Sequence, residues 1–173
     1  MSEANDLCRI KLLLFDVDGI LTDGSLYVGE GGDLLKRFHI HDGAGLVMAR
    51  RAGLLVGLLS GHDSNATKRR AASLGIDICH VGVKDKVAVL NEILQETGLS
   101  LNECLFMGDD LQDLPVLSRV GYSVSVPNAR KDVRSRVDLV TDARGGEGAV
   151  REVVELCLRA KGLWDASIGE FLS

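Results

Sequence analysis

Two aspartates follow directly after an apolar run near the start of the chain. The run is Leu12–Phe15, and Asp16, Val17, Asp18 and Gly19 come next. Like charges at the end of a buried strand repel each other, so a fold keeps them only with a compensating charge, such as a divalent cation. One aspartate could then act as a nucleophile while the other moves a proton. These residues alone also allow an ordinary Asx turn that ends a strand.

Further groups with the chemistry of a phosphate site follow in order along the chain. Ser60 and Gly61 end a second apolar run and offer a hydroxyl and a backbone N–H group to a phosphoryl oxygen. Lys86 lies early in an expected helix, where its ammonium could neutralise a phosphate or the nucleophile. Asp109 and Asp113 follow a third run and could complete an oxygen-lined magnesium site. Each group alone has an ordinary explanation, but together they indicate a phosphate-handling enzyme.

Composition limits the class of protein. The chain has 173 residues, of which 46% are hydrophobic and 26% charged, which predicts a single soluble globular domain over residues 1–173. Its net charge of −5 argues against nucleic acid or an anionic membrane as a partner. The four cysteines form no C-x-x-C pair, so we expect reduced thiols. Without a signal-peptide pattern or a long apolar span, we expect a cytoplasmic protein.

Short apolar runs alternate with amphipathic stretches along the chain. The expected strands are Ile10–Phe15, Leu54–Ser60, Ile76–His80, Cys104–Gly108, Tyr122–Val126 and Asp138–Val140. The expected helices are Gly43–Ala52, Ser64–Leu74, Lys84–Thr97, Asp110–Arg119, Ala129–Val137 and Glu147–Ala160. This order predicts an α/β fold, in which helices cover both faces of a doubly wound parallel sheet. In such sheets the site lies beyond the carboxyl ends of the strands.

Two segments depart from the alternation. Residues 20–38 predict a β-hairpin with arms at 26–28 and 34–35 and a glycine turn at 29–32. This hairpin would act as a flap over the site, since the chain has no room for a separate cap domain. The tail at 161–173 is unusually apolar for a terminus, which predicts burial against the body or a partner. Its apolar residues are Leu163, Trp164, Ile168, Phe171 and Leu172.

The set of candidate groups resembles the haloacid dehalogenase superfamily from residue 10 to about residue 152. The resemblance implies that Asp16 is the nucleophile that becomes an aspartyl-phosphate. It also implies that Asp18 protonates the leaving oxygen and then activates water. Ser60 and Lys86 match the phosphate-binding residues of that superfamily.

The same resemblance implies a bound magnesium ion. Its ligands would be the carboxylates of Asp16 and Asp109 and the backbone carbonyl of Asp18. Asp113 matches a supporting acid that holds these ligands in place.

A closer resemblance is to the capless branch of this superfamily that includes the 3-deoxy-D-manno-octulosonate 8-phosphate phosphatases. It rests on residues 18–24, 36–45 and 145–152. It implies magnesium-dependent hydrolysis of an acidic sugar phosphate, most simply this octulosonate phosphate of lipopolysaccharide biosynthesis. It also implies a homotetramer with sites near the subunit interfaces. The implied substrate-binding residues are Asp18, His39, His41, Asp42, Gly43, Gly61, His62, Arg70 and Lys86.

Departures from that branch keep the substrate open. Position 62 is a histidine, where octulosonate enzymes usually carry arginine and some nonulosonate phosphatases carry glutamate. Val47 replaces an arginine of the octulosonate type, and Ser73 a lysine of the nonulosonate type. A nonulosonate 9-phosphate phosphatase is therefore an alternative in the same class. From another class, a phospho-acceptor signalling domain also combines acids, magnesium, a hydroxyl and a lysine.

Two further motifs carry open alternatives. His39 and His41 would share one face of an extended segment, where they could contact substrate, form polar surface or, with Asp42, bind a metal. Residues 144–148 could be a flexible approach to a helix or a mobile segment that reaches toward a site, including one on another subunit.

Overall fold

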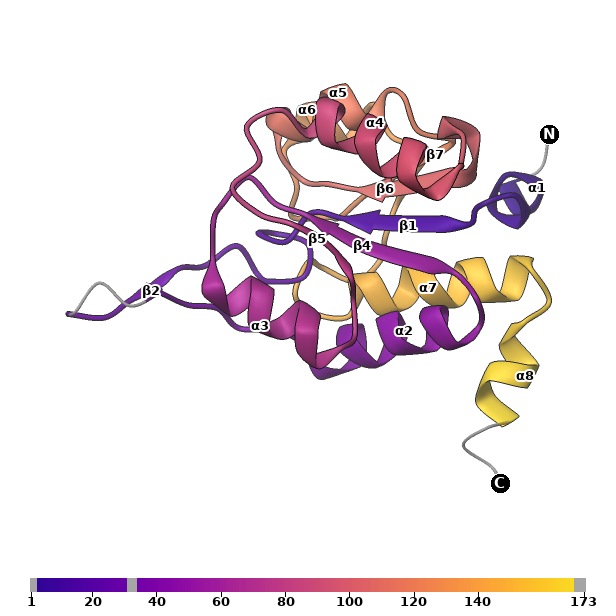
Figure 1. The fold of residues 1–173 in the computed structure, drawn as a ribbon, viewed down its shortest axis with the longest axis horizontal. Helices are drawn as coiled ribbons and strands as arrows, with labels where there is room; N and C mark the ends of the chain where they lie inside the picture. Colours follow the sequence, from indigo (N-terminus) through magenta and orange to yellow (C-terminus); the bar gives the residue numbers. More distant parts are fainter. Residues whose placement is uncertain (1–2, 31–33, 170–173) are drawn as a thin grey trace.

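The computed structural model describes residues 3–30 and 34–169. Its centre is a sheet of six parallel strands in the order β5-β4-β1-β6-β7-β8 (Figure 1). The strands are β1 (Leu12–Phe15), β4 (Leu55–Leu59), β5 (Ile78–His80), β6 (Cys104–Met107), β7 (Tyr122–Ser125) and β8 (Leu139–Val140). The predicted doubly wound parallel sheet is confirmed, and the element ends differ from expectation by a few residues. The three strands followed by the candidate acids and Ser60, namely β4, β1 and β6, are neighbours in the sheet.

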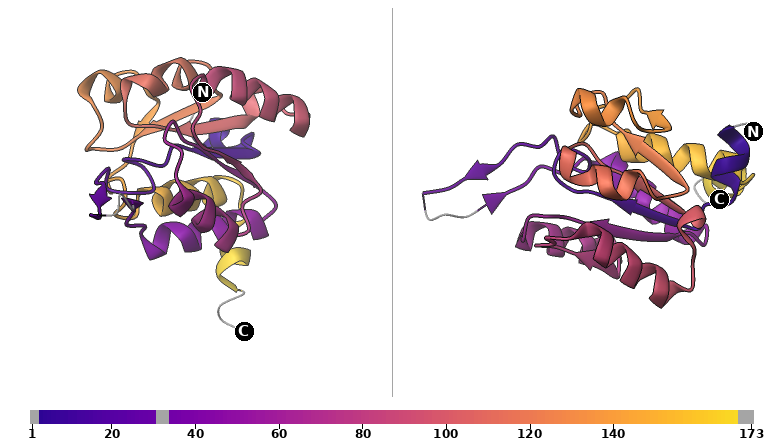
Figure 2. Two further views of the ribbon diagram at one scale, coloured as in Figure 1. Left: turned by 60° about the vertical axis from the view of Figure 1, so that its left-hand side comes forward. Right: turned by 90° about the horizontal axis from the view of Figure 1, so that it is seen from above.

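Helices cover both faces of the sheet, as Figures 1 and 2 show. One face carries α2 (Ile40–Arg51), α3 (Asn65–Ser73) and α7 (Ala149–Ala160). The other carries α4 (Lys86–Thr97), α5 (Leu114–Leu117) and α6 (Lys131–Arg134). Two single turns, η1 (Leu101–Glu103) and η2 (Leu111–Asp113), flank β6. Short helices α1 (Glu3–Cys8), which the sequence did not predict, and α8 (Trp164–Gly169) lie at the end away from the hairpin.

Strand β1 fixes the position of the candidate nucleophile because both of its faces are buried. Leu13 and Phe15 point into the core beneath α2 and α7, and Leu12 and Leu14 point into the core beneath α4 and α5. None of these side chains is exposed to solvent, and each such burial is worth about 1.5–3 kcal/mol. The loop that begins at Asp16 therefore starts from the most firmly held strand of the sheet.

A hairpin leaves the body just after β1, as predicted. Its strands β2 (Tyr27–Val28) and β3 (Leu34–Leu35) pair in antiparallel fashion and project away from the sheet (Figures 1 and 2). No separate cap domain is present in the part of the chain that the structure describes. Two glycines of the expected turn, Gly31 and Gly32, lie outside the described residues.

The prediction of an extended segment around His39 and His41 was wrong. Helix α2 begins at Ile40, and His39 is its extended N-terminal flanking residue. The two imidazole rings meet edge to face with centroids 5.1 Å apart. The helix starts three residues earlier than expected, and Ile40 at its start is 79% exposed.

The apolar tail packs against the body, as expected for Leu163, Trp164 and Ile168. The guanidinium carbon of Arg159 lies 4.3 Å from the centroid of the Trp164 ring, a cation–π contact that anchors α8 on α7. Phe171 and Leu172 lie outside the described residues.

All four cysteines are free thiols, as expected, although Cys8 is exposed and Cys79 only half-buried. Burial raises the pKa of both Cys104 and Cys157 to about 12, so these thiols stay protonated. No helix among the described residues is long and apolar enough to cross a membrane.

Candidate active site

A buried lysine joins two of the predicted acids. Lys86 is the first residue of α4, and its ammonium Nζ donates to Asp16 Oδ1 at 2.8 Å and to Asp113 Oδ1 at 2.7 Å. Helix α4 starts here because the Asp85 side chain accepts hydrogen bonds from the N–H groups of Val87 and Ala88. All three charged side chains are nearly inaccessible to solvent. The structure therefore brings together residues from the ends of β1, the start of α4 and the turn after β6.

Asp113 is held by three donors. Besides the Lys86 contact, its Oδ2 accepts hydrogen bonds from the backbone N–H groups of Asp109 and Asp110, at 3.1 and 3.2 Å. These bonds fold the loop after β6 into the turn η2, which directs Asp109 toward the end of β1. Asp113 thus fixes the backbone at Asp109 and Asp110.

Gly19 allows Asp109 to come close to the loop after β1. The φ angle of Gly19 is +91°, a region that side chains disfavour, and a Cβ atom there would lie 2.1 Å from Asp109 Oδ2. A glycine after Asp18 is therefore required both by the backbone turn and by the approach of the carboxylate.

Three carboxylates surround one ammonium, and the pKa values of Asp16 and Asp109 are raised. Burial, followed by the charge of Asp113, raises the pKa of Asp16 to about 7 although Lys86 opposes the rise. Burial, followed by the charge of Asp16, raises the pKa of Asp109 to about 7. Burial lowers the pKa of Lys86, but the charges of Asp16 and Asp113 outweigh it and the pKa is raised. The cluster is short of positive charge.

A divalent cation fits this deficit. Oxygens of Asp16, Asp109 and Asp113 all lie within 4.8 Å of one another. Carboxylate oxygens are the ligands that Mg²⁺ prefers, and a second cation would relieve the repulsion that raises the two pKa values. Since Asp113 already accepts three hydrogen bonds, Asp16 and Asp109 are the carboxylates with free oxygens.

Asp18 lies beside a second lysine. The ammonium Nζ of Lys36 donates to Asp18 Oδ2 at 2.8 Å, and it also lies 2.7 Å from Oδ1 without hydrogen-bonding geometry to that atom. His62 Nδ1 is 3.8 Å from Asp18 Oδ2. Asp18 is about one third exposed, unlike Asp16. The two aspartates therefore occupy different surroundings, the first buried and the second open to a ligand.

Ser60 lies buried directly after β4, and it does not cap a helix. Ser64 caps α3 instead, since its side chain accepts a hydrogen bond from the Thr67 N–H group. The helix expected over Ser64–Leu74 is thus confirmed, with Ser64 as its N-cap. Within residues 3–30 and 34–169, the hydrogen bonds of Ser60 Oγ are two long contacts of 3.3 Å with the backbone of His62, so its hydroxyl can turn toward a ligand.

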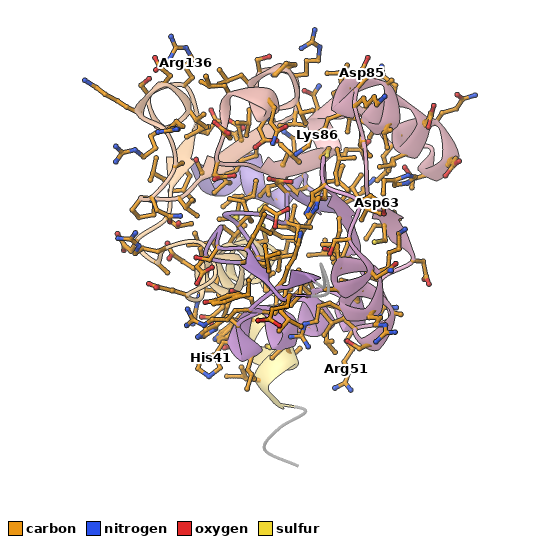
Figure 3. All side chains as sticks on the ribbon, turned by 90° about the vertical axis from the view of Figure 1, so that its left-hand side faces the viewer. His41, Arg51, Asp63, Asp85, Lys86 and Arg136 are labelled. Carbon is orange, nitrogen blue, oxygen red and sulfur yellow. The ribbon has the colours of Figure 1, made fainter. Side chains whose placement is uncertain are left out.

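Two predicted substrate residues from different helices meet near the start of α2. Arg70 on α3 packs its guanidinium against Gly43, and its central carbon lies 5.8 Å from the centroid of the Phe38 ring. Lys68 and Arg69 are exposed, as expected for a solvated helix face. His41 is exposed at the same end of α2, and Figure 3, which looks from the hairpin side, shows it well below Lys86.

The structure gives Asp42 a role other than the predicted substrate contact. Its side chain is inaccessible to solvent, and its carboxylate accepts hydrogen bonds from the backbone N–H groups of Arg151, at 2.9 Å, and Gly148, at 3.3 Å. Burial raises its pKa, and these amides oppose the rise. Asp42 thus provides hydrogen-bond acceptors for the N–H groups at the start of α7, and it joins α7 to α2.

The glycine-rich segment before α7 packs against the loop that follows β1 in the same chain. Gly146 N–H donates to the Ile20 carbonyl at 2.8 Å, and Gly145 N–H donates to Asn128 Oδ1 at 2.9 Å. A Cβ atom on Gly145 would lie 1.7 Å from the Gly19 carbonyl oxygen. This close contact favours a role in bracing the loop that carries Asp18.

Sequence reasoning did not assign Lys36 a role. This residue lies in one of the segments that carried the family resemblance, yet its contact with Asp18 depends on how the hairpin folds back. A usable signal was present: the returning arm of a hairpin that begins after Asp18 must end near Asp18.

Comparisons with known proteins agree with this geometry. A sequence model of the family described as haloacid dehalogenase-like hydrolase matches residues 62–153. The chain is 38% identical to the Escherichia coli 3-deoxy-D-manno-octulosonate 8-phosphate phosphatase KdsC over 162 residues, which cover 94% of this chain and 86% of that enzyme.

Solved structures show the same fold throughout. The phosphatase of this name from Moraxella catarrhalis, in complex with a magnesium ion, a phosphate ion and a KDO molecule, superimposes with a TM-score of 0.95 at 38% identity, and 97% of each chain is covered. The cobalt-bound form of the Haemophilus influenzae phosphatase has a TM-score of 0.92 at 36% identity and covers 97% of this chain and 99% of its own. The chain therefore belongs to the haloacid dehalogenase-like hydrolases, in the family of the 3-deoxy-D-manno-octulosonate 8-phosphate phosphatases.

Proposed function

We propose that the protein is a magnesium-dependent phosphatase that hydrolyses 3-deoxy-D-manno-octulosonate 8-phosphate through an aspartyl-phosphate. The observation that carries this proposal is the position of Lys86 between Asp16 and Asp113, with Asp109 beside them and Asp18 two residues away. This arrangement provides a nucleophile, a buried positive charge and a separate acid within one loop cluster.

The first step transfers the phosphoryl group to the protein. A carboxylate oxygen of Asp16 attacks phosphorus, and the bond from phosphorus to the sugar oxygen breaks as Asp18 gives that oxygen a proton. Lys86 balances charge beside the nucleophile, and the hydroxyl of Ser60 holds a phosphoryl oxygen. Magnesium bound by Asp16, Asp109 and the Asp18 carbonyl would neutralise phosphate charge that otherwise repels the carboxylates.

The second step releases inorganic phosphate. Asp18, now a carboxylate, takes a proton from water as the water oxygen attacks phosphorus. The bond between phosphorus and Asp16 breaks and regenerates its carboxylate. The partial exposure of Asp18 suits this role, since water must reach it, whereas the burial of Asp16 keeps bulk water from competing in the first step.

Recognition of the sugar acid belongs to groups outside the phosphate centre. Arg70, His41 and His62 supply cationic or polar side chains from three segments of the described chain. Arg70 is always charged and suits a substrate carboxylate, whereas His62 is charged only when protonated. A nonulosonate 9-phosphate is the second candidate substrate because a histidine at position 62 matches neither type.

The protein is further proposed to act as a homotetramer whose sites lie near subunit interfaces. Large apolar side chains on the hairpin and at the start of α2 are 49–79% exposed, which is unusual for a surface in contact with water. They are Leu26, Tyr27, Val28, Leu35 and Ile40. Light scattering coupled to gel filtration tests this: a monomer at working concentration would contradict it.

A substrate panel tests the proposed function. Phosphate release is measured with magnesium from octulosonate 8-phosphate, nonulosonate 9-phosphate and simple hexose phosphates, and again after addition of EDTA. We expect the highest kcat/KM for the octulosonate ester and loss of activity with EDTA. Preference for the nonulosonate ester would select the second candidate, and absence of turnover on every ester would overturn a phosphatase.

A further inference from the structure

The two catalytic aspartates are held by two different lysines. Asp16 is bound by Lys86, which comes from the core of the domain. Asp18 is bound by Lys36, which follows β3 in the returning arm of the hairpin. The nucleophile therefore depends on the sheet and α4, whereas the proposed acid and base depends on the flap.

The contact between Lys36 and Asp18 is well enclosed. The Lys36 side chain is inaccessible to solvent, and among the described residues it is the only hydrogen-bond donor to the Asp18 carboxylate. A lysine loses much rotamer freedom when its ammonium is fixed, so a buried contact of this kind requires a compensating gain.

Lys36 contacts both oxygens of the Asp18 carboxyl group. Its ammonium donates a hydrogen bond to Oδ2 at 2.8 Å and lies 2.7 Å from Oδ1, which has no hydrogen-bond partner in the part of the chain described. Two contacts from one ammonium hold the carboxyl group in a single orientation, which a group that transfers a proton needs.

We propose that Lys36 is a positioning residue that orients the Asp18 carboxyl for proton transfer and so couples the seating of the flap to catalysis. This inference rests on the proposed function, because it assigns Lys36 to the proton-transfer steps of that reaction. Lys36 itself forms and breaks no bond. When the hairpin is displaced, Asp18 loses its hydrogen-bond donor, and neither step has a correctly placed acid or base.

Substrates whose leaving groups differ in basicity can distinguish a residue that positions Asp18 from one that acts on the nucleophile, the phosphate or the sugar. A sugar alkoxide must be protonated as it leaves, so the first step with a sugar phosphate needs Asp18. p-Nitrophenolate leaves without a proton, so the first step with p-nitrophenyl phosphate does not. The second step needs Asp18 as base with either ester. If a Lys36 variant misplaces Asp18, the first step with p-nitrophenyl phosphate should keep its rate, and every other step should slow.

The experiment compares Lys36→Met, Lys36→Arg and Arg37→Met with the wild-type chain. Arg37 is a matched control because it is the next residue, is exposed and pairs with Asp23 rather than Asp18. For Lys36→Met we expect kcat for the best sugar phosphate to fall about 10- to 100-fold, with KM changed less than about twofold. Stopped-flow mixing with p-nitrophenyl phosphate should show a burst of p-nitrophenolate at the wild-type rate, followed by slow turnover.

Lys36→Arg should recover part of kcat because it also donates to a carboxylate, and Arg37→Met should match the wild type. A burst that slows as much as sugar-phosphate turnover would overturn the inference, since Lys36 would then act on the nucleophile or the phosphate. A rise in KM alone would also overturn it, by indicating a substrate contact. An active wild type with an unaffected Lys36→Met variant refutes this inference alone, whereas an inactive wild type refutes the proposed function as well.

Discussion

Asp16 and Lys86 lie 70 positions apart in the sequence, yet their side chains form a buried ion pair with an Nζ–Oδ1 distance of 2.8 Å. The pair joins the end of β1 to the first residue of α4, which lie on different layers of the fold. Because Lys86 also binds Asp113, its single charge is shared between two carboxylates. Burial and the charge of Asp113 raise the pKa of Asp16 to about 7 although Lys86 opposes the rise, and a bound cation would lower it again.

Asp16→Asn should abolish phosphatase turnover and leave the fold intact. An amide cannot attack phosphorus, but it has the size of the carboxylate and removes a charge that burial and Asp113 oppose. The melting temperature should therefore equal or exceed that of the wild type. Asp63→Asn is the control, since Asp63 is exposed and forms an ion pair with Lys68. Substantial phosphate release by Asp16→Asn would contradict the assignment of the nucleophile.

Lys86→Met should be costly for both stability and activity. It leaves the carboxylates of Asp16 and Asp113 buried without a cation, and breaking such a pair costs about 3–5 kcal/mol. Turnover should fall at least about a hundredfold, because a donor beside the reacting charge is lost. Urea denaturation and phosphate release measure the two effects. Lys84→Met, at an exposed site two residues earlier, should change neither; equal stability of the two variants would argue against the buried pair.

Stability without metal should depend on pH through Asp16 and Asp109. Their pKa values are raised from 3.8 to about 7, so the folded chain binds protons more tightly than the unfolded chain. The contribution of these two groups to the stability of the metal-free chain is therefore fully present at and below pH 3.8, and it is lost as the pH rises through about 7.

Magnesium competes with these protons, so it should raise the melting temperature more at about pH 8 than at about pH 5. Differential scanning fluorimetry with magnesium and with EDTA checks this. Asp109→Asn should lose most of the magnesium effect, and an equal shift at both pH values would count against a site built from these carboxylates.

Asp42→Ala should act on stability rather than on substrate affinity. Removal of the carboxylate leaves the buried N–H groups of Gly148 and Arg151 without an acceptor, a loss of about 1–3 kcal/mol. His41→Ala, at the exposed neighbouring position, should leave the unfolding midpoint unchanged. A rise in KM without a loss of stability would contradict this prediction and would favour the substrate contact that the family resemblance implied for Asp42.

Much of the fold could be predicted because its determinants are local. Apolar runs of strand length and amphipathic stretches of helix length alternate, and a parallel sheet follows from that order. The acids that follow β1 and β6 could be placed at one edge because the carboxyl ends of parallel strands meet there. Helix α1 was not predicted. The start of α2 was also missed, because Ile40 is helical yet exposed and so breaks the expected periodicity of buried apolar residues.

The sequence by itself determined the chemistry of the site: carboxylates after β1, a hydroxyl after β4 and a lysine at the start of α4. Only the tertiary structure decided which of these groups touch. In the folded chain, Asp42 accepts a hydrogen bond from an amide of α7, and Lys36 of the hairpin donates one to Asp18. The reason is physical, because strand ends are encoded by short-range periodicity, whereas the partner of a charged side chain depends on how separate segments pack together.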